Sequence, residues 1–326
     1  KTTVVARKMI NYLQDWNRPH QGIAVLSFTN VASDEIGHQA TEMLPKGFNI
    51  DAPHFVGTLD SFIDNYILLR FGYLLLRSPK RPIIISSDIV NSYRFWRREC
   101  HTNCLSNIGD FRWTLNGKLT KNGKEITCVG NGRYDPPCIQ FKKGLLEKGL
   151  FFQDEVPGLA CILLERHPEI AKSIASRFPV IILDEAQDTS EEQMRILDLL
   201  CNAGLESIYI VGDPDQSIYE WRNANPESFL EKMRDPGWTQ LVLSKNFRSS
   251  QLICNATYVF SDTNKDKVAN EASGPFAVYN KKPVLFLYGK GTGEDSIIQK
   301  FKEECIACDI SFSPDKVAIV TRDRIH

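Results

Sequence analysis

Short apolar runs alternate along the chain with stretches in which apolar residues recur every three or four positions. The runs at 22–28 and 180–183 are rich in apolar residues, which predicts buried strands of a parallel sheet, and the runs at 55–58 and 208–211 predict two further strands. The helical spacing between and before them, as in residues 4–13, predicts amphipathic helices. This alternation of strand and helix is typical of an α/β fold.

The same pattern resumes after residue 240. Apolar runs at 241–243, 284–288 and 317–320 predict strands of a second α/β domain, which stops in the middle of the pattern at His326.

Between about residues 72 and 149 the rhythm is interrupted, which predicts an inserted subdomain. Asn-Gly pairs at 116–117 and 122–123 are hairpin signals. From residue 94 to residue 148 there are eleven Lys and Arg residues but five Asp and Glu residues, with aromatic residues between them. A solvated basic face and a nucleic-acid surface both fit this composition.

Composition and charge limit the classes of function. The 326 residues exceed one ordinary core, so at least two domains are expected. A formal net charge of -1 offers no overall attraction to nucleic acid, so strand binding needs a local basic patch or stacking. No apolar run approaches the roughly 20 residues that span a bilayer, so no membrane partner is expected. The nine scattered cysteines favour a reducing compartment, the cytoplasm or, in a eukaryote, the nucleus.

The strand predicted at 180–183 ends in two adjacent carboxylates, Asp184 and Glu185. Ligands bind at the strand ends of α/β sheets, and charges at the edge of a core need partners. Mg²⁺ prefers a carboxylate, waters and substrate phosphates, so we assign Asp184 to the metal and Glu185 to a water that attacks a phosphate. The alternative is a strand that leads into a capped helix, since residues 189–193 have the pattern of a capping box.

Other residues fit the same phosphate chemistry. Lys1-Thr2-Thr3 looks like the end of a phosphate-binding loop, with Lys1 on the β/γ-phosphates and Thr2 on Mg²⁺, although it also fits the ragged start of a helix. Gln216 follows a predicted strand and could sense a γ-phosphate. Arg248 is either a surface residue or an arginine finger from a neighbouring domain.

A further group of side chains suits contact with a nucleic-acid strand. Thr29 and Asn30 follow one predicted strand, and Thr58 and Ser61 follow another. Each pair is explained either as a helix cap or as a contact to a phosphate backbone. Two aromatic residues after Gln216 could stack on unpaired bases: Tyr219 and Trp221.

These motifs, in this order, resemble those of the UvrD/Rep/PcrA-like helicases of superfamily 1 along nearly the whole chain. The segment from Gly212 to Arg222 follows the family's G-D-P-x-Q-S-I-Y-x-[FW]-R and is highly specific. The other similar segments are motif Ia at 27–32, motif Ib at 57–62, motif II at 184–188 and motif IV at 246–249.

The resemblance implies two RecA-like P-loop NTPase domains with parallel sheets, the second incomplete, and a basic subdomain inserted into the first. The first domain is expected at residues 1–71 and 150–239, the insertion at 72–149 and the second domain at 240–326. ATP and Mg²⁺ are the expected nucleotide and metal.

The resemblance also implies roles for single residues. Those at the nucleotide are Lys1, Thr2, Thr3, Asp184, Glu185, Gln216, Phe247 and Arg248, with Thr2 and Asp184 on Mg²⁺ and Phe247 near the adenine. Those on the DNA strand are Phe28, Thr29, Asn30, Thr58, Ser61, Tyr219, Trp221 and Arg222, the last of which links the two sites.

Two positions depart from the family pattern. Val31 replaces the usual Lys of motif Ia, and Asp60 replaces the usual His of motif Ib, and both changes weaken phosphate contacts. The Walker A glycines and motifs V and VI do not occur in this sequence. We therefore expect a fragment that does not hydrolyse ATP by the family mechanism on its own.

The function implied by the resemblance is an ATP-dependent translocase or helicase that moves 3′ to 5′ on single-stranded DNA and acts at single/double-strand junctions. The alternative is an ATP-switched nucleic-acid sensor or the partner subunit of a nuclease in anti-phage defence, as in Gabija-type systems, without processive unwinding. A P-loop enzyme unrelated to DNA would leave Tyr219 and Trp221 without a role.

Overall fold

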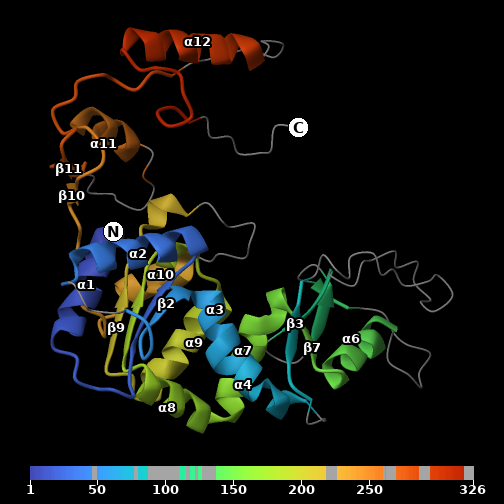
Figure 1. Cartoon of the computed structure of the whole chain (residues 1–326). Helices are drawn as coiled ribbons and strands as arrows, with labels where there is room; N and C mark the ends of the chain where they lie inside the picture. The colour runs from blue at the N-terminus through green and yellow to red at the C-terminus, as the bar shows by residue number, and fades with distance from the viewer. Residues whose placement is uncertain are drawn as a thin grey trace. The chain divides into compact units, whose positions relative to one another are not determined.

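The chain divides into two compact units, Lys1–Val242 and Leu243–His326 (Figure 1). The computed structural model describes residues 1–45, 50–76, 80–86, 110–114, 118–121, 124–126, 137–217, 226–259, 261, 269–285 and 294–318.

A four-stranded sheet in the order β2-β1-β8-β9 forms the centre of the first unit, and every pairing in it is parallel. Its strands are β1 (Ile23–Ser27), β2 (Phe55–Thr58), β8 (Val180–Leu183) and β9 (Ser207–Ile210). The two central strands, β1 and β8, are buried at every position. The strands predicted from the four apolar runs are therefore confirmed, with small shifts at their ends.

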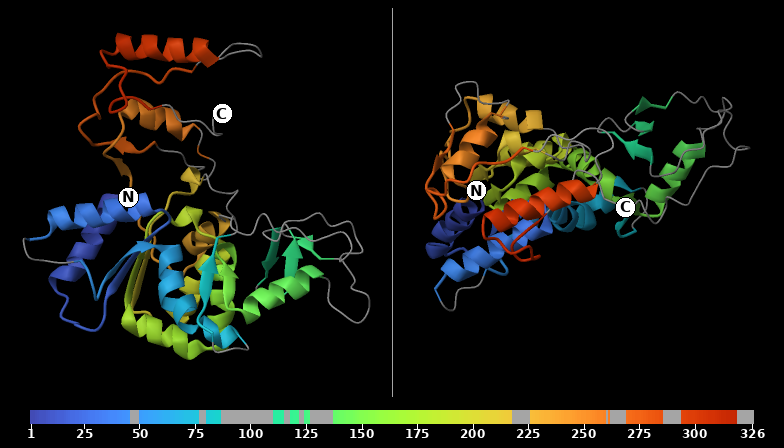
Figure 2. Two further views of the ribbon diagram at one scale, coloured as in Figure 1. Left: turned by 45° about the vertical axis from the view of Figure 1, so that its right-hand side comes forward. Right: turned by 90° about the horizontal axis from the view of Figure 1, so that it is seen from above.

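Helices cover both faces of this sheet (Figure 1, Figure 2). Because side chains alternate along a strand, Val25 and Ile182 face the helices α1 (Thr2–Gln14) and α2 (Asn30–Met43). The opposite face, which includes Leu26, packs on four other helices: α3 (Leu59–Ile63), α7 (Val156–Arg166), α8 (Pro168–Arg177) and α9 (Glu191–Asn202). The first unit is thus a three-layer α/β sandwich.

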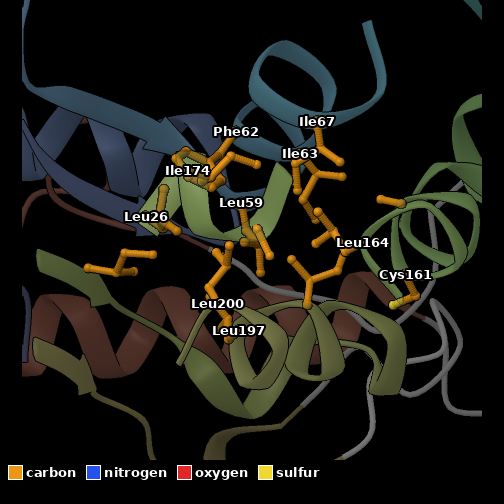
Figure 3. Packing of buried hydrophobic residues seen from close by; sticks show 14 of the residues in the cluster. Leu26, Leu59, Phe62, Ile63, Ile67, Cys161, Leu164, Ile174, Leu197 and Leu200 are labelled. Atoms are coloured by element: carbon orange, nitrogen blue, oxygen red, sulfur yellow. The ribbon is translucent and has the colours of Figure 1, made fainter. Parts of the chain in front are cut away.

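One hydrophobic cluster packs on each face of the central sheet, and the larger of these two lies on the face that α3 and α7 cover. Figure 3 shows Leu26 of β1, Leu59 of α3, Leu164 of α7, Ile174 of α8 and Leu200 of α9 gathered in this cluster. The helix α10 (Pro226–Arg234) adds Phe229 to the same core. This packing fixes the sheet edge at which β1, β2 and β8 end together.

The segment after α3 carries a buried acidic group. A π-helical segment (Asp64–Leu68) continues α3 and leads into α4 (Leu69–Phe71) and a 3-10 helix (Gly72–Leu75). Both carboxylate oxygens of Asp64 accept hydrogen bonds from Gln153 Nε2, at 3.2 and 3.1 Å. Burial nevertheless raises the pKa of Asp64 from its ordinary value of 3.8 to about 6, with a smaller contribution from the charge of Asp60.

Replacing Asp64 with Asn is expected to stabilise the protein at pH 7.5 and to help less as the pH falls. The folded state binds the Asp64 proton more tightly than the unfolded state, so the stability of the parent protein falls as pH rises from about 4 to about 6. Above pH 6 the ionised carboxylate is a constant penalty that Asn removes. Thermal unfolding of both proteins at pH 7.5 and pH 4.5 measures this difference. An advantage of Asn that is equal at both pH values would contradict it, and Asp34→Asn at an exposed position is the control.

Elements that lie between β2 and β8 in the sequence form a separate, smaller hydrophobic core. β3 (Ile83–Ile85) pairs in parallel with β7 (Leu150–Phe152), and β4 (Phe111–Trp113), β5 (Leu119–Lys121) and β6 (Lys124–Glu125) form an antiparallel sheet. The pairing of β4 with β5 and of β5 with β6 confirms the predicted hairpins. Together with α6 (Pro137–Glu147), these elements build a core of their own around Phe111 and Phe152. Their assignment to an inserted subdomain stays a prediction.

One lysine of the basic stretch is not solvated, which corrects its assignment to a basic surface. Lys142 Nζ lies 2.6 Å from Glu155 Oε1, and the two side chains are 1% and 2% exposed. Lys142 also lies over the ring of Phe152, and Glu155 accepts a hydrogen bond from the backbone N–H of Trp113 at 3.1 Å. Burial lowers the pKa of Lys142 and raises the pKa of Glu155, because each charged form loses water.

The described part of the second unit contains little sheet. β10 (Lys245–Asn246) and β11 (Glu271–Ala272) form one parallel pair, and α11 (Gln251–Tyr258) and α12 (Glu294–Ala307) are its helices.

The strands predicted at 241–243, 284–285 and 317–318 are wrong, because these residues are irregular; residues 286–288 and 319–320 lie outside the described part of the chain. Leu241 and Leu285 are 85% and 80% exposed. An apolar run becomes a buried parallel strand only where other elements cover both of its faces.

None of the helices in the described ranges is long and apolar enough to cross a membrane.

Candidate nucleotide site at the sheet edge

The acidic pair lies at the carboxyl end of β8, in the middle of the sheet. The backbone N–H of Asp184 donates to Leu26 O at 2.8 Å, which continues the pairing of β8 with β1. Asp184 is 0% exposed, and its Oδ1 accepts a hydrogen bond from Glu185 N at 3.0 Å. Its Oδ2 has no hydrogen-bond partner among the described residues. Burial, followed by the charge of Glu185, raises the pKa of Asp184.

Glu185 has a backbone conformation that is uncommon for a residue with a side chain. Its φ of 53° and ψ of 43° lie in the left-handed region. The neighbouring Ala186 N–H donates to Val211 O at 3.0 Å, which anchors this turn to the chain that leaves β9. A short 3-10 helix (Ala186–Asp188) follows it. Backbone strain of this kind costs energy and is found mostly at functional sites.

Lys1, Glu185 and Gln216 meet although they are far apart in the sequence. Lys1 Nζ donates to Glu185 Oε2 at 2.8 Å and to Gln216 Oε1 at 3.2 Å. Burial alone would raise the pKa of Glu185, but hydrogen bonds from Gln187 and Lys1 outweigh it and hold that pKa below its usual range. The structure therefore brings together three residues that the sequence assigned to one nucleotide.

Gln187 is a site residue that the sequence reasoning missed. Its side chain bonds to Glu185 and to the backbone of Asp213, and it is 1% exposed. The sequence signal that could have identified Gln187 is its position between Glu185 and Asp188, directly after a buried strand. Its partner at residue 213 cannot be read from local sequence.

The donor atoms present fit Mg²⁺. Asp184 offers a buried carboxylate oxygen without a hydrogen-bond partner among the described residues. Thr2 and Thr3 lie in the first turn of α1, next to Lys1, with Thr2 partly buried and Thr3 exposed. In the described part of the chain, no group of three or more His, Cys, Asp or Glu side chains is arranged to hold a metal ion. Mg²⁺ suits such a set because it takes one or two carboxylates and completes its shell with waters and substrate phosphates.

The two predicted pairs of polar residues, Thr29 with Asn30 and Thr58 with Ser61, follow strands that end side by side, because Ser27 at the end of β1 is in register with Thr58 at the end of β2. Thr29 Oγ1 accepts a hydrogen bond from Ala32 N at 3.2 Å, and Thr58 Oγ1 accepts one from Ser61 N at 3.1 Å. The capping roles that the sequence left open for Thr29 and Thr58 are therefore confirmed. Ser61 Oγ donates to Thr58 O at 2.8 Å. Phe28 is half-buried beside this edge, and Asn30 is exposed.

The two departures from the family pattern have different surroundings. Val31 is 80% exposed at the start of α2. The carboxylate of Asp60 accepts a hydrogen bond from Gln193 Nε2 at 2.6 Å. Gln193 Oε1 accepts in turn from Ser190 N at 2.8 Å, and Gln193 N donates to Ser190 Oγ at 3.2 Å. The predicted capping box of α9 is thus confirmed as Ser190 with Gln193.

Tyr219, Trp221 and Arg222 are outside the described residues. Phe247 and Arg248 belong to the second unit, where Phe247 is 66% exposed and the backbone N–H of Arg248 donates to Asn246 Oδ1 at 2.9 Å.

The sequence of the chain is similar to that of one protein family and of several known proteins. Residues 138–237 match the family model of the UvrD/REP helicase N-terminal domain. The chain is 27% identical over 305 residues to the Gabija protein GajB of Bacillus cereus (strain VD045), an alignment that covers 91% of this chain and 52% of that protein. It is 32% identical over 183 residues to the exonuclease/helicase subunit RexA of Lactococcus lactis subsp. cremoris (strain MG1363), over 49% of this chain and 15% of that protein.

The chain thus spans about half the length of GajB and a smaller share of RexA. The family match and these relatives confirm that the chain resembles the UvrD-like superfamily 1 helicases, the Gabija type included, as its motifs predict.

Proposed function

We propose that this chain carries the nucleotide site of an ATP-driven translocase or helicase that acts on single-stranded DNA. The observation that supports this most directly is the meeting of Lys1, Glu185 and Gln216 at the end of the central strands. A cation, a carboxylate and an amide at one strand end are the groups that phosphoryl transfer needs.

Each residue has a distinct role in this proposal. Lys1 neutralises charge on the β/γ-phosphates of ATP, to which its ammonium group moves from Glu185. Asp184 and Thr2 would hold Mg²⁺, which would supply positive charge to offset the negative charge that develops on the phosphates. Glu185 is ionised at neutral pH and accepts a proton from the attacking water. Gln216 bonds to the γ-phosphate.

The proposal extends to the architecture. The parallel sheet of the first unit serves as a RecA-like domain at residues 1–71 and 150–239, with residues 72–149 as its insertion. Residues 240–326 form part of a second RecA-like domain, which carries Phe247 and Arg248.

Strand movement depends on a link between nucleotide and DNA. The turn that contains Gln216 leads in the sequence to Tyr219 and Trp221, which stack on bases, and to Arg222, which links the sites. The DNA strand contacts a group of side chains near the carboxyl ends of β1 and β2: Phe28, Thr29, Asn30, Thr58 and Ser61. The direction of movement is 3′ to 5′.

The match to GajB over 91% of the chain favours a second candidate function. In it, the protein is an ATP-switched sensor of nucleic acid or the partner of a nuclease in antiviral defence, and it does not unwind DNA processively. The name of the exonuclease/helicase subunit RexA supports an association with nuclease activity in the same way.

ATPase assays of the full-length protein with and without single-stranded DNA test the proposal, and a tailed duplex separates its two versions. We expect hydrolysis that rises with single-stranded DNA. Strand displacement on a duplex with a 3′ tail supports the translocase, whereas stimulated ATPase without displacement, together with co-purification of a nuclease, supports the sensor. A rate of ATP hydrolysis that does not change when single-stranded DNA is added would overturn both versions of the proposal.

A further inference from the structure

Two cysteines lie three positions apart at the carboxyl end of α12. Cys305 belongs to the last turn of the helix and is 6% exposed, whereas Cys308 directly follows the helix and is partly exposed. Both are free thiols, as are the other cysteines in the described part of the chain. The proposed function uses neither of them.

The last turn of α12 is tightened, which brings these two side chains together. The backbone N–H of Cys308 donates both to Glu304 O and to Cys305 O, at 3.1 Å each. The second bond is that of a 3-10 turn, in which side chains three positions apart eclipse each other. In either helical form the two Cα atoms are roughly 5–6 Å apart, inside the roughly 4.4–6.8 Å that a disulfide spans. A disulfide between Cys305 and Cys308 can therefore form without moving α12 as a whole.

The chain that follows folds back and anchors this turn. Asp309 has a φ of 57°, in the left-handed region, which reverses the direction of the backbone. The backbone N–H of Ile310 then donates to Cys305 O at 2.9 Å. The ring of Phe312 meets the ring of Phe301 edge to face, with 5.9 Å between the centroids. The two cysteines thus lie in a turn whose backbone is bonded on both sides.

A lysine from another segment contacts the more exposed thiol. Lys281 Nζ donates to Glu304 Oε2 at 2.8 Å and also to the side chain of Cys308. These hydrogen bonds, to Glu304 first and to Cys308 second, raise the pKa of Lys281, so this group is an ammonium ion at neutral pH. The thiolate is the nucleophilic form of cysteine, and a neighbouring ammonium group favours it. The Glu304 carboxylate and the carboxyl end of the helix oppose it, so Lys281 is the group on which the reactivity of Cys308 depends.

We propose that Cys305 and Cys308 form a reversible oxidation site, in which Cys308 reacts first with hydrogen peroxide and Cys305 completes a disulfide. This inference is independent of the proposed function. In a reducing compartment, which the scattered cysteines favour, free thiols are the resting form, and the disulfides that do form are usually transient, catalytic or redox-sensing.

The oxidation balances with hydrogen peroxide as the oxidant. The Cys308 thiolate attacks one peroxide oxygen, so that an S–O bond forms, the O–O bond breaks, and the departing hydroxide takes up the proton of the thiol as water. Cys308 is then a sulfenic acid. The Cys305 thiol attacks the sulfur of Cys308, an S–S bond forms, the S–O bond breaks, and a second water leaves with the proton of Cys305. A dithiol reductant restores both thiols by exchange.

Mass spectrometry of the full-length protein treated with hydrogen peroxide tests this site. The protein is unfolded and alkylated after treatment, so that cysteines in a disulfide escape the label. We expect a disulfide between Cys305 and Cys308 that dithiothreitol removes, while Cys254, which is buried in α11, stays labelled. Cys305→Ser should stop the reaction at the sulfenic acid of Cys308, which dimedone captures. Cys308→Ser should leave Cys305 unoxidised.

The chain supplies a matched control for the role of the lysine. Lys281→Met should slow the oxidation of Cys308 by roughly three- to tenfold, the effect of one partly exposed charge on a neighbouring thiolate. Lys281→Arg keeps the charge and should keep most of the parental rate. Lys282→Met changes the exposed neighbour and should keep all of it.

Two results would overturn the oxidation site. One is a parent protein in which both cysteines stay labelled at peroxide concentrations that oxidise free cysteine. The other is a disulfide that joins Cys308 to a cysteine other than Cys305. Equal rates in Lys281→Met and Lys282→Met would overturn the role of Lys281. These outcomes leave the proposed function intact, because none of the measurements depends on ATP hydrolysis.

Discussion

Replacing Glu185 with Gln is expected to lower the kcat of DNA-stimulated ATP hydrolysis by roughly 10²- to 10⁴-fold, the usual contribution of a general base. The amide has the same size as the carboxylate but cannot take the proton of the attacking water. Glu185 is suited to this role because hydrogen bonds from Gln187 and Lys1 keep it ionised. Steady-state ATPase assays of the full-length protein measure the loss, and binding of a fluorescent ATP analogue shows whether the nucleotide still enters.

The matched control is Glu191→Gln, which removes an exposed carboxylate from the first turn of α9. Its ATPase rate should equal that of the parent protein. A Glu185→Gln protein that binds and hydrolyses ATP at the parental rate would remove Glu185 as the base and leave Lys1 with only a structural ion pair.

Replacing Lys142 with Met is expected to lower the free energy of unfolding by about 3–5 kcal/mol, because it leaves Glu155 buried without its cation. The carboxylate would keep the backbone N–H of Trp113 as a partner, which cannot offset the loss of a charge 2.6 Å away. Urea unfolding of the full-length protein, followed by circular dichroism, measures the change.

Two further variants separate the buried charge from lost packing. Lys143→Met alters the exposed neighbour in α6 and should change stability by no more than about 0.5 kcal/mol. The double variant Lys142→Met with Glu155→Leu removes both charges and should recover most of the loss, since apolar pairs often replace buried ion pairs without cost. A double variant as unstable as Lys142→Met alone would show that packing, and not the unpaired carboxylate, accounts for the effect.

The sequence predicts the parts of the fold that follow from periodicity. The strands of the first unit, α1 and the capping box of α9 all follow from apolar spacing or from residue types at fixed offsets. The strands expected after residue 240 fail because an apolar run alone does not supply the neighbours that bury it. In the described residues, Val284 and Leu285 remain exposed.

The candidate site also contains residues that the sequence predicts and residues that only the folded structure reveals. Asp184 and Glu185 stand out because charges at the end of a buried strand need partners, and Lys1 and Gln216 follow from motif patterns. Gln187 does not stand out, because its role depends on Asp213, which only the pairing of β8 with β9 brings near. Lys142 is similar: in the sequence it belongs to a basic stretch, and only the packing of α6 against Phe152 and Glu155 shows that it is buried.

The order of strands in the central sheet has a consequence for biosynthesis. Ala24 is in register with Phe55, so β1 and β2 can pair early, whereas Ile23 must wait for Val180. Pairing between segments so far apart is slow, and the other edge of β1 stays open on the ribosome until β8 emerges. Lys1 can meet Glu185 only after β8 has emerged, because 184 positions separate the two residues in the sequence.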